Sequence, residues 1–188
     1  MIHKPMTGLF PLPTILVTSQ SGNSKPNIIT IAWTGVMNSN PPVVYIGVNP
    51  IRYSHELIKA SGEYVINIPS KEQINVVDYC GLISGRKVDK FEASGLTPVP
   101  STHVQAPLIA ECPVNLECKV RQVLNLESHD VFIADVLAVH YNENVLDEKG
   151  RPDVTKIDTY AYCLGEYYAV SDKLGTMGIS KKNSDFRF

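Results

Sequence analysis

Side chains that could contact a ligand recur through residues 27–54, a stretch that is otherwise apolar. Residues 27–33 read Asn-Ile-Ile-Thr-Ile-Ala-Trp, and isoleucine alternates with Thr30 and Ala32 at the period of a strand with one face on a core. The other face then presents a hydroxyl, a small side chain and the nearby indole of Trp33. This set suits a planar aromatic ligand with polar edges. The alternative is an ordinary half-buried hairpin whose threonine faces water.

A second polar group lies where the strand expected over residues 43–49 meets a short helix. Ser54 is expected to be the N-cap of this helix, and Gly62 is placed to end it. The free amides of the first helical turn, with Arg52 and the Ser54 hydroxyl beside them, form a candidate anion site. The competing interpretation is a plain helix cap that binds nothing.

The composition is that of a globular chain large enough for one core. Its 188 residues are 44% hydrophobic and 19% charged with a formal net charge of −2, so we expect one domain over residues 1–188. No block of lysine or arginine argues for nucleic acid or an anionic membrane as a partner. Neither a signal peptide nor a run of roughly 18 apolar residues is recognisable, so we expect a cytoplasmic protein.

The usual catalytic and metal-binding motifs are missing from the sequence. It has no C-x-x-C, no histidines at metal-ligand spacing, no G-x-S-x-G, no H-E-x-x-H, no G-x-G-x-x-G after a strand and no P-loop. Hydroxyls, amides, one tryptophan and a few cations are what a site could be built from, and these suit an anionic, planar cofactor. Four buried thiols in a reducing compartment are expected at Cys80, Cys112, Cys118 and Cys163.

At least six strand-like segments, mostly joined as hairpins, are interspersed with two or three short helices. This order argues against a parallel Rossmann-type sheet and favours a mainly β fold, a closed or nearly closed antiparallel barrel with short peripheral helices. Residues 34–42 are expected to be a connection of turn formers, and Ser70 with Gln73 has the capping-box spacing of a second helix start. The expected strands are residues 14–20, 27–33, 43–49, 63–68, 107–126 and 131–140.

The C-terminal part carries aromatic side chains followed by a polar tail. His129 is expected at the tip of the last hairpin or just inside its mouth, where a plain turn residue is the alternative. Residues 157–168 contain four tyrosines, Tyr162 among them. Residues 171–188 have few apolar anchors, so we expect this tail to be loose unless it lies across another body, such as a second subunit.

Two segments together point to a known family. Residues 64–69 read Tyr-Val-Ile-Asn-Ile-Pro and residues 84–91 read Ser-Gly-Arg-Lys-Val-Asp-Lys-Phe. With their order and separation, the chain resembles the flavin reductase-like proteins over about residues 5–170, and among these the flavoredoxins most. Ser54 stands where that family frequently has threonine. The other segments that carry the resemblance are residues 27–33, 43–49 and 127–130.

The resemblance implies an FMN-binding split β-barrel, Greek-key-like, that works as a homodimer with the flavin near the subunit interface. Carried over by position, the residues that would line the isoalloxazine are Asn27, Thr30, Ala32 and Trp33. Arg52 and Ser54 would hold the phosphate, and the residues that would contact the phosphate or the ribityl chain are Ser84, Gly85 and Lys90. His129 and Tyr162 would close over the cofactor from the same or the partner subunit.

The activity that the resemblance implies is electron transfer through bound FMN. NAD(P)H or a protein donor would deliver electrons to the flavin at N5, and a flavin, ferric iron or a protein would accept them. Because the cofactor performs the chemistry, no catalytic acid–base residue is required. A non-catalytic FMN-binding or storage protein is the alternative, and a barrel without flavin is a third. From the residues alone, Lys90 can also be a solvated helix charge and Trp33 a plain core residue.

Overall fold

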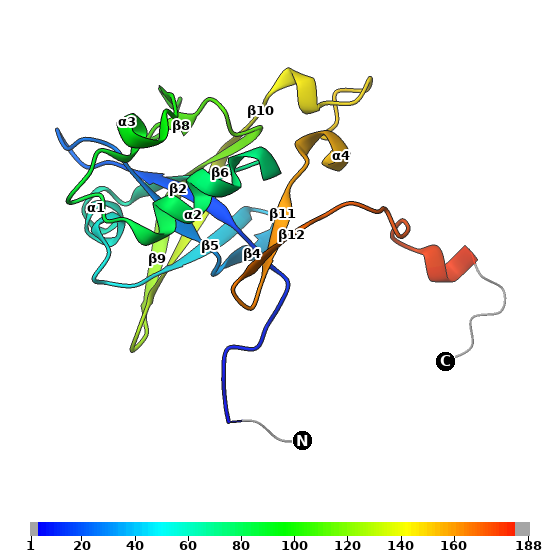
Figure 1. The fold of residues 1–188 in the computed structure, drawn as a ribbon, viewed down its shortest axis with the longest axis horizontal. Helices are drawn as coiled ribbons and strands as arrows, with labels where there is room; N and C mark the ends of the chain where they lie inside the picture. Colours follow the sequence, from blue (N-terminus) through cyan, green and yellow to red (C-terminus); the bar gives the residue numbers. More distant parts are fainter. Residues whose placement is uncertain (1–3, 183–188) are drawn as a thin grey trace.

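The structure, a computed structural model, describes residues 4–182. Seven strands form one antiparallel sheet with the spatial order β3-β2-β6-β9-β10-β5-β4 (Figure 1). The mainly β, antiparallel fold expected from the sequence is confirmed. The seven strands are β2 (Ile15–Ser19), β3 (Asn27–Ile31), β4 (Thr34–Ser39), β5 (Pro42–Val48), β6 (Glu63–Ile68), β9 (Val114–Asn125) and β10 (Asp130–Tyr141).

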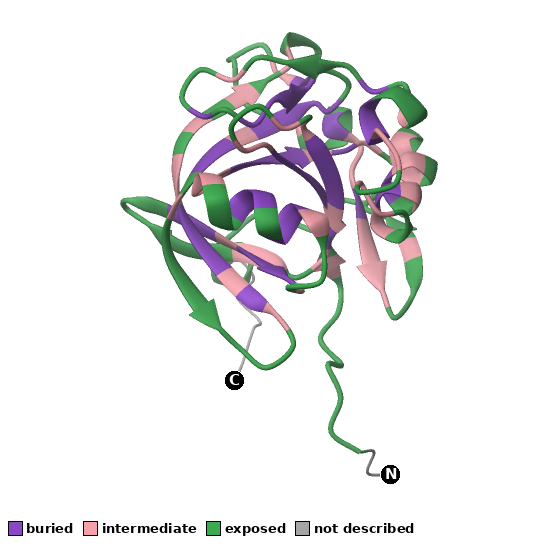
Figure 2. Cartoon of the chain, turned by 90° about the vertical axis from the view of Figure 1, so that its left-hand side faces the viewer, coloured by how far each residue is buried: buried purple, intermediate pink, exposed green. Residues whose placement is uncertain are grey.

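The sheet curls around the main core, and its buried residues line the inside of the barrel (Figure 2). Val17 of β2 belongs to the same core cluster as Ile46 of β5 and Phe132 of β10. All five residues of β2 are buried, because the opposite face of the strand, which carries Leu16, packs under helices outside the barrel. Burial on both faces explains why residues 14–20 do not alternate between polar and apolar side chains.

Helices cover one end and one outer face of the barrel. Ile58 of the first helix enters the barrel core, and Gly62 ends that helix with a φ of 71°, the left-handed conformation expected of a C-terminal glycine. The capping box of Ser70 and Gln73 is present and opens the second helical region. The helices concerned are α1 (Tyr53–Ser61), η1 (Lys71–Gln73), α2 (Ile74–Leu82) and α3 (Lys90–Ser94), of which α1, α2 and α3 contact β3.

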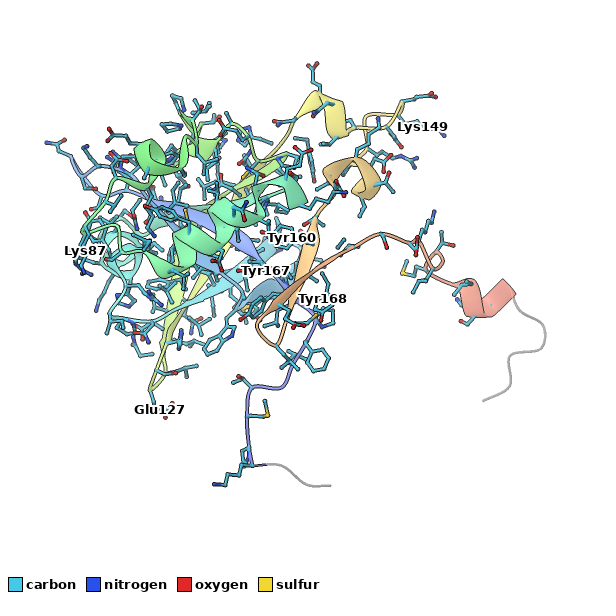
Figure 3. All side chains as sticks on the ribbon, viewed as in Figure 1. Lys87, Glu127, Lys149, Tyr160, Tyr167 and Tyr168 are labelled. Carbon is cyan, nitrogen blue, oxygen red and sulfur yellow. The ribbon has the colours of Figure 1, made fainter. Side chains whose placement is uncertain are left out.

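A smaller three-stranded sheet of β1 (Leu12–Pro13), β11 (Tyr160–Cys163) and β12 (Glu166–Ala169) flanks the barrel. Its β11–β12 hairpin carries four tyrosines, of which Figure 3 labels Tyr160, Tyr167 and Tyr168. The chain after β12 runs away from the barrel, and residues 183–188 of the expected tail lie outside the described residues (Figure 1). The remaining elements are β7 (Pro98–Val99), β8 (Leu108–Ile109), η2 (Glu143–Val145), α4 (Val154–Ile157) and η3 (Ile179–Lys182). Within residues 4–182, no helix has the length and apolar character to cross a membrane.

Three local expectations are wrong. Residues 34–42 are not only a turn, because residues 34–39 form strand β4 at the edge of the sheet, where pairing with β5 satisfies their backbone groups. Ser54 is not the N-cap of α1, because Arg52 holds that position. Ser54 lies in the first turn, where its hydroxyl oxygen accepts a hydrogen bond from Asn27 of β3. Cys163 is only half-buried, whereas the other three cysteines are buried free thiols.

Glu117 of β9 is fully buried, and its carboxylate holds the preceding loop against the barrel. It accepts hydrogen bonds from the amides of Thr102 at 2.9 Å, His103 at 2.5 Å and Val104 at 3.2 Å. The Nε2 atom of His140 on β10 lies 2.7 Å from the same carboxylate. Hydrogen bonds from three amides and the histidine compensate the burial of this charge.

We expect Glu117→Gln to lower the free energy of unfolding by about 3 kcal/mol, because it removes a buried carboxylate that accepts from three amides and places an NH2 group against one of these donors. Denaturant unfolding followed by circular dichroism measures the change. Glu127→Gln, at the exposed tip of the β9–β10 hairpin (Figure 3), is the matched control and should change stability by less than about 0.5 kcal/mol. Equal stability of the Glu117 and Glu127 variants would contradict the assigned role.

Candidate functional site

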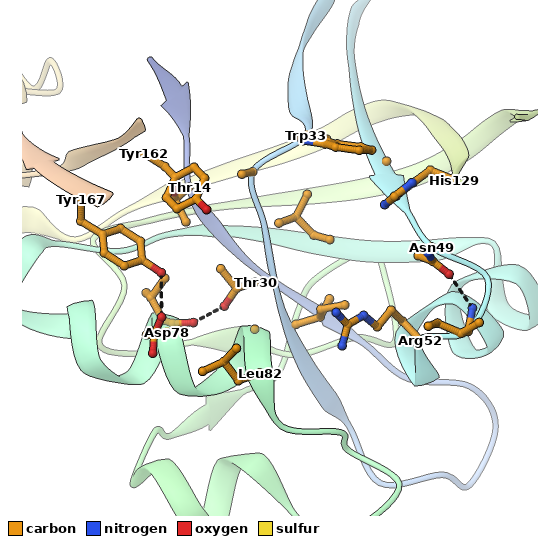
Figure 4. Close-up of a pocket in the computed structure, with 17 residues that line it drawn as sticks. Thr14, Thr30, Trp33, Asn49, Arg52, Asp78, Leu82, His129, Tyr162 and Tyr167 are labelled. Atoms are coloured by element: carbon orange, nitrogen blue, oxygen red, sulfur yellow. Dashed lines mark hydrogen bonds between the residues drawn. The ribbon is translucent and has the colours of Figure 1, made fainter. Parts of the chain in front are cut away.

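Two adjoining cavities lie where β3, the start of α1, the end of α2 and the tip of the β9–β10 hairpin meet. The larger has a volume of about 470 Å³ and the smaller about 130 Å³. Figure 4 shows the larger cavity with Trp33, His129 and Arg52 toward one end and Asp78, Tyr162 and Tyr167 toward the other. Four residues line both cavities and make them continuous: Ile29, Ile51, Arg52 and Gly81.

The smaller cavity has a tightly packed polar wall. The Nδ2 atom of Asn27 donates to the Ser54 hydroxyl oxygen at 2.8 Å, and both side chains are buried. A Cβ atom on Gly85 would lie only 1.9 Å from the Asn27 Oδ1 atom, so no other residue fits without displacing Asn27. The bond from Asn27 uses the Ser54 oxygen as an acceptor, which leaves the Ser54 proton available to a ligand in this cavity.

The start of α1 borders the smaller cavity without a capping side chain. Arg52, at the N-cap position, has an extended backbone conformation and makes no side-chain bond to the first turn. The next residues, Tyr53 and Ser54, also line the cavity. A nine-residue helix whose first amides are not capped by a side chain offers hydrogen-bond donors and the positive end of its dipole to an anion.

Lys90 brings a buried positive charge to the same cavity. Its side chain is only 3% exposed, and Nζ donates to the carbonyl oxygens of Ile28 at 2.6 Å and Cys80 at 2.7 Å. Burial lowers the pKa of Lys90 to about 8, and the nearby Arg52 guanidinium lowers it too. Neither Lys90 nor Arg52 forms an ion pair with a carboxylate anywhere in residues 4–182. An anion in this cavity would compensate both charges.

The adjacent end of the larger cavity has an aromatic wall. Trp33 is 41% exposed, and its ring lies 4.2 Å from the His129 ring, measured between centroids, at an angle of 46°. Burial, together with the charge of Arg52, lowers the pKa of His129. A neutral imidazole beside a half-exposed indole presents flat, polarisable surface to a planar ligand.

The floor of the larger cavity is the junction of β3 with α2. The Thr30 hydroxyl donates to the carbonyl oxygen of Val77, and a Cβ atom on Gly81 would lie 3.3 Å from the Thr30 Cβ. Glycine at position 81 therefore lets α2 approach the strand closely. Because the Thr30 proton is used by α2, the hydroxyl can serve a ligand only as an acceptor.

A buried hydrogen-bonded pair joins the two parts of the site. The His55 Nε2 atom lies 2.7 Å from the Asp130 carboxylate, and both side chains are less than 10% exposed. The His55 ring also packs edge-on against Phe132, with centroids 5.3 Å apart. His55 follows Ser54 at the start of α1, and Asp130 follows His129, so the pair fixes the smaller cavity relative to the aromatic wall. The hydrogen bond from His55 lowers the pKa of Asp130.

All eleven residues selected from the sequence line one or both cavities. The alternative of a solvated charge is wrong for Lys90, and that of a plain core residue is wrong for Trp33. His129 is at once a turn residue and part of the cavity wall. The roles of the eleven as FMN ligands stay predictions. Sequence reasoning did not select four other residues that line the larger cavity, because no motif contains them: Thr14, Asp78, Gly81 and Tyr167.

Comparisons with known proteins agree with this geometry. The family model described as "Flavin reductase like domain" matches residues 6–171. The structure of the flavoredoxin of Desulfovibrio vulgaris (Miyazaki F) superposes with a TM-score of 0.89 at 34% identity and covers 96% of this chain and 100% of that one. The flavoredoxin from Methanosarcina acetivorans gives a TM-score of 0.85 at 32% identity, covering 96% and 99%. An uncharacterised protein of Archaeoglobus fulgidus is 36% identical over 78% of this chain and 80% of its own length.

The affinity of the smaller cavity for a phosphate ester should decrease as the pH rises above about 8. A bound dianion stabilises charged Lys90, so the pKa of Lys90 is higher in the complex than the value of about 8 in the free protein. Below that pH, Lys90 carries its proton in the free protein and in the complex, so the affinity is constant. Above it, Lys90 of the free protein has lost its proton, and ligand binding must be accompanied by proton uptake. Titration calorimetry with FMN from pH 7 to 9.5 measures the effect. Lys90→Met should bind more weakly and lose most of the dependence between pH 8 and 9.5; an unaltered pH profile would refute the assignment.

Proposed function

Because the chain belongs to the flavin reductase-like family, we propose that it binds FMN and works as an oxidoreductase of the flavoredoxin or flavin reductase type. One observation carries the proposal. Two cations that have no carboxylate partner among residues 4–182, Lys90 and Arg52, meet an uncapped helix start beside a cavity with an aromatic wall. FMN combines a phosphate dianion with a planar ring system, which is the combination that these two adjoining cavities suit.

The smaller cavity would hold the phosphorylated end of FMN. Arg52, Lys90 and the Ser54 hydroxyl would donate charge-assisted hydrogen bonds, with the first amides of α1 beside them. Ser84 and Gly85 line the same cavity and would contact the phosphate or the ribityl chain. Asn27 would act by orienting Ser54, to which it already donates a hydrogen bond.

The larger cavity would hold the isoalloxazine, which supplies the redox chemistry when FMN is bound. Trp33 and His129 would pack beside the ring system, while Thr30 and Ala32 would lie along the strand beneath it. Arg52 near the ring would favour the extra negative charge of the reduced cofactor and raise its reduction potential. Tyr162 would close over the cofactor from the β11–β12 hairpin.

Electrons would enter from NAD(P)H or a protein donor and leave to a flavin, to ferric iron or to a protein acceptor. The half-exposed indole of Trp33 supports access by both a donor and an acceptor, because this part of the cavity wall is open to solvent. No acid–base residue is required of the protein, because the cofactor exchanges the electrons. The protein would position the cofactor and set its potential.

We further propose that the protein is a homodimer. Edge strand β4 exposes 78% of Val36 and 52% of Met37, and the N-terminal arm exposes 76% of Leu9 and 53% of Phe10. β1 of that arm contacts β4, so these apolar surfaces lie close together. An edge strand with exposed apolar side chains is a surface that proteins normally cover.

FMN binding is tested with the single tryptophan as the probe. Titration of the protein with FMN should quench the fluorescence of Trp33. Addition of NADH or NADPH under anaerobic conditions should then bleach the visible absorbance of the oxidised flavin. Arg52→Ala with Ser54→Ala should weaken FMN binding by about 3 to 6 kcal/mol, since each hydrogen bond to a charged group contributes about 1.5–3 kcal/mol.

The matched control for this double variant is Arg121→Ala with Ser61→Ala, which removes the same residue types away from both cavities. It should bind FMN like the wild type. Folded wild-type protein that ignores FMN at micromolar concentration would overturn the proposed function. Normal binding with slow or absent bleaching by either nicotinamide would favour the alternative, a non-catalytic FMN-binding or storage protein.

The dimer is tested by sedimentation equilibrium. The wild type should have twice the mass of the 20.8 kDa chain. Val36→Lys with Met37→Lys should shift it toward the monomer, because two charges would have to be desolvated in the contact. Lys substitutions at the exposed residues Val123 and Leu126 of the β9–β10 hairpin provide a comparison for another apolar surface. A wild-type monomer would contradict the proposal.

A further inference from the structure

The loop that joins α2 to α3, residues 83–89, lies between two cavities. Residues 83–85 line the smaller cavity described above, and residues 85–89 line a third cavity with a volume of about 460 Å³. The loop therefore stands between the candidate phosphate cavity and the third one. Three residues border both of these cavities: Asn27, Tyr53 and Gly85.

On the side of the smaller cavity, the loop packs closely and offers a hydroxyl. The backbone at Gly85 is so near Asn27 that a Cβ atom would lie 1.9 Å from the Asn27 Oδ1 atom. The loop turns tightly, with the Lys87 amide donating to the carbonyl oxygen of Ser84 at 3.0 Å. The Arg86 amide donates to the Ser84 hydroxyl oxygen at 3.4 Å, so the proton of that hydroxyl can be donated to a ligand. An outward movement of the loop would remove both the packing and this donor from the cavity.

The Arg86 side chain fastens the loop to the start of α1. Its Nη2 atom lies 2.7 Å from the Glu56 carboxylate, and its Nη1 atom donates to the carbonyl oxygen of Ile51 at 3.2 Å. The guanidinium carbon also lies 5.2 Å from the centre of the Tyr53 ring. The hydrogen bonds that join residues 84–88 to other elements of the described chain all come from this side chain. One guanidinium thus decides whether the middle of the loop stays on α1.

A second ion pair fastens the C-terminal end of the loop to the turn between β2 and β3. The Lys25 Nζ atom donates to the Asp89 carboxylate at 3.0 Å, and Asp89 is also the N-cap of α3. Both pairs lie at the surface, since the side chains of Lys25 and Glu56 are 79% and 63% exposed. Exposed ion pairs are individually weak and are screened by salt. The loop is therefore held by contacts that can open without unfolding the barrel.

We propose that residues 83–89 are a gate of the smaller cavity, and that Arg86 is the positioning residue that keeps the gate closed through Glu56. With the pair formed, the loop covers a bound phosphate group. With the pair open, the loop moves into the space of the third cavity and the phosphate loses its contacts with Ser84 and Gly85. This inference rests on the proposed function, which places the phosphate of FMN in the smaller cavity. It makes the exchange of a phosphorylated flavin depend on ionic strength.

The rate of FMN release from Glu56→Gln tests the gate. Stopped-flow fluorescence follows the release after dilution of the FMN-saturated protein below its Kd. The gate predicts release that is about twofold to fivefold faster than from the wild type, the factor that one exposed ion pair supplies. Direct electrostatics predicts the opposite, because removing a negative charge near a bound phosphate should slow its release.

The matched control is Asp135→Asn. Asp135 forms another exposed ion pair, at 3.1 Å with Arg121, and the Arg121 and Arg86 side chains are equally exposed. Neither Asp135 nor Arg121 lines the cavities on the two sides of the loop. The control should release FMN at the wild-type rate.

Ionic strength separates the gate from a general loosening of α1. Raising the KCl concentration from about 0.05 M to about 1 M screens the exposed pair of the wild type, whereas Glu56→Gln has no such pair to screen. Release should therefore accelerate more with salt in the wild type and in Asp135→Asn than in Glu56→Gln.

Cleavage by trypsin detects opening of the loop in the absence of any flavin. The loop contains the consecutive trypsin sites Arg86 and Lys87, and mass spectrometry of the fragments identifies cleavage there. FMN-free Glu56→Gln should be cut at these two sites about twofold to fivefold faster than the wild type and Asp135→Asn. Saturation with FMN should slow this cleavage in all three proteins.

Each outcome decides between the two proposals. Release from Glu56→Gln at the wild-type rate or more slowly would overturn the gate, and so would an equal effect of salt on both proteins. Failure of FMN to bind would refute the proposed function. In that case, the rate of cleavage at Arg86 and Lys87 would still decide whether Glu56 holds the loop closed.

Discussion

A buried ammonium group with no carboxylate partner in the described part of the chain is the constraint on which the rest of the site depends. Two carbonyl oxygens satisfy two of the three N–H groups of Lys90, and its charge faces a cavity that Arg52 also borders. Taking such a charge from water is unfavourable unless an opposite charge compensates it. The uncapped start of α1 makes the same cavity suitable for an anion, and the close packing of Gly85 on Asn27 leaves no room for a side chain at position 85.

The barrel places these groups by keeping two hydrophobic cores on opposite faces of the same strands. Val17 packs in the inner core and Leu16 in the outer one, so β2 anchors the barrel and the helix layer together. The outer core contains Phe91, next to Lys90, and thereby holds the ammonium against β3. On the other side, the His55–Asp130 pair ties α1 to the hairpin that carries His129. Groups from four elements are thus held around one continuous space.

Much of the fold and site was predictable because the relevant signals are local. Hairpin-connected strands with short helices predicted the antiparallel barrel, and Gly62 predicted the end of α1 through its need for a left-handed conformation. Strand β4 was not predictable in this way, since its pairing with β5 outweighs the turn preference of its own residues. Ser54 failed as a cap for a related reason: Asn27, twenty-seven residues earlier, supplies the hydrogen bond that decides the direction of its hydroxyl.

The sequence by itself determined the residue types that line the two cavities, because hydroxyl, indole and cation recur at the spacing of strands and helix starts. It also determined the family, since motif order along the chain is a property of sequence. Only the tertiary structure decided which charges are buried and which are solvated, as with Lys90 and Glu117. It alone brought Thr14 and Asp78 to one end of a cavity. The physical reason is that burial and charge compensation depend on neighbours that are distant along the chain.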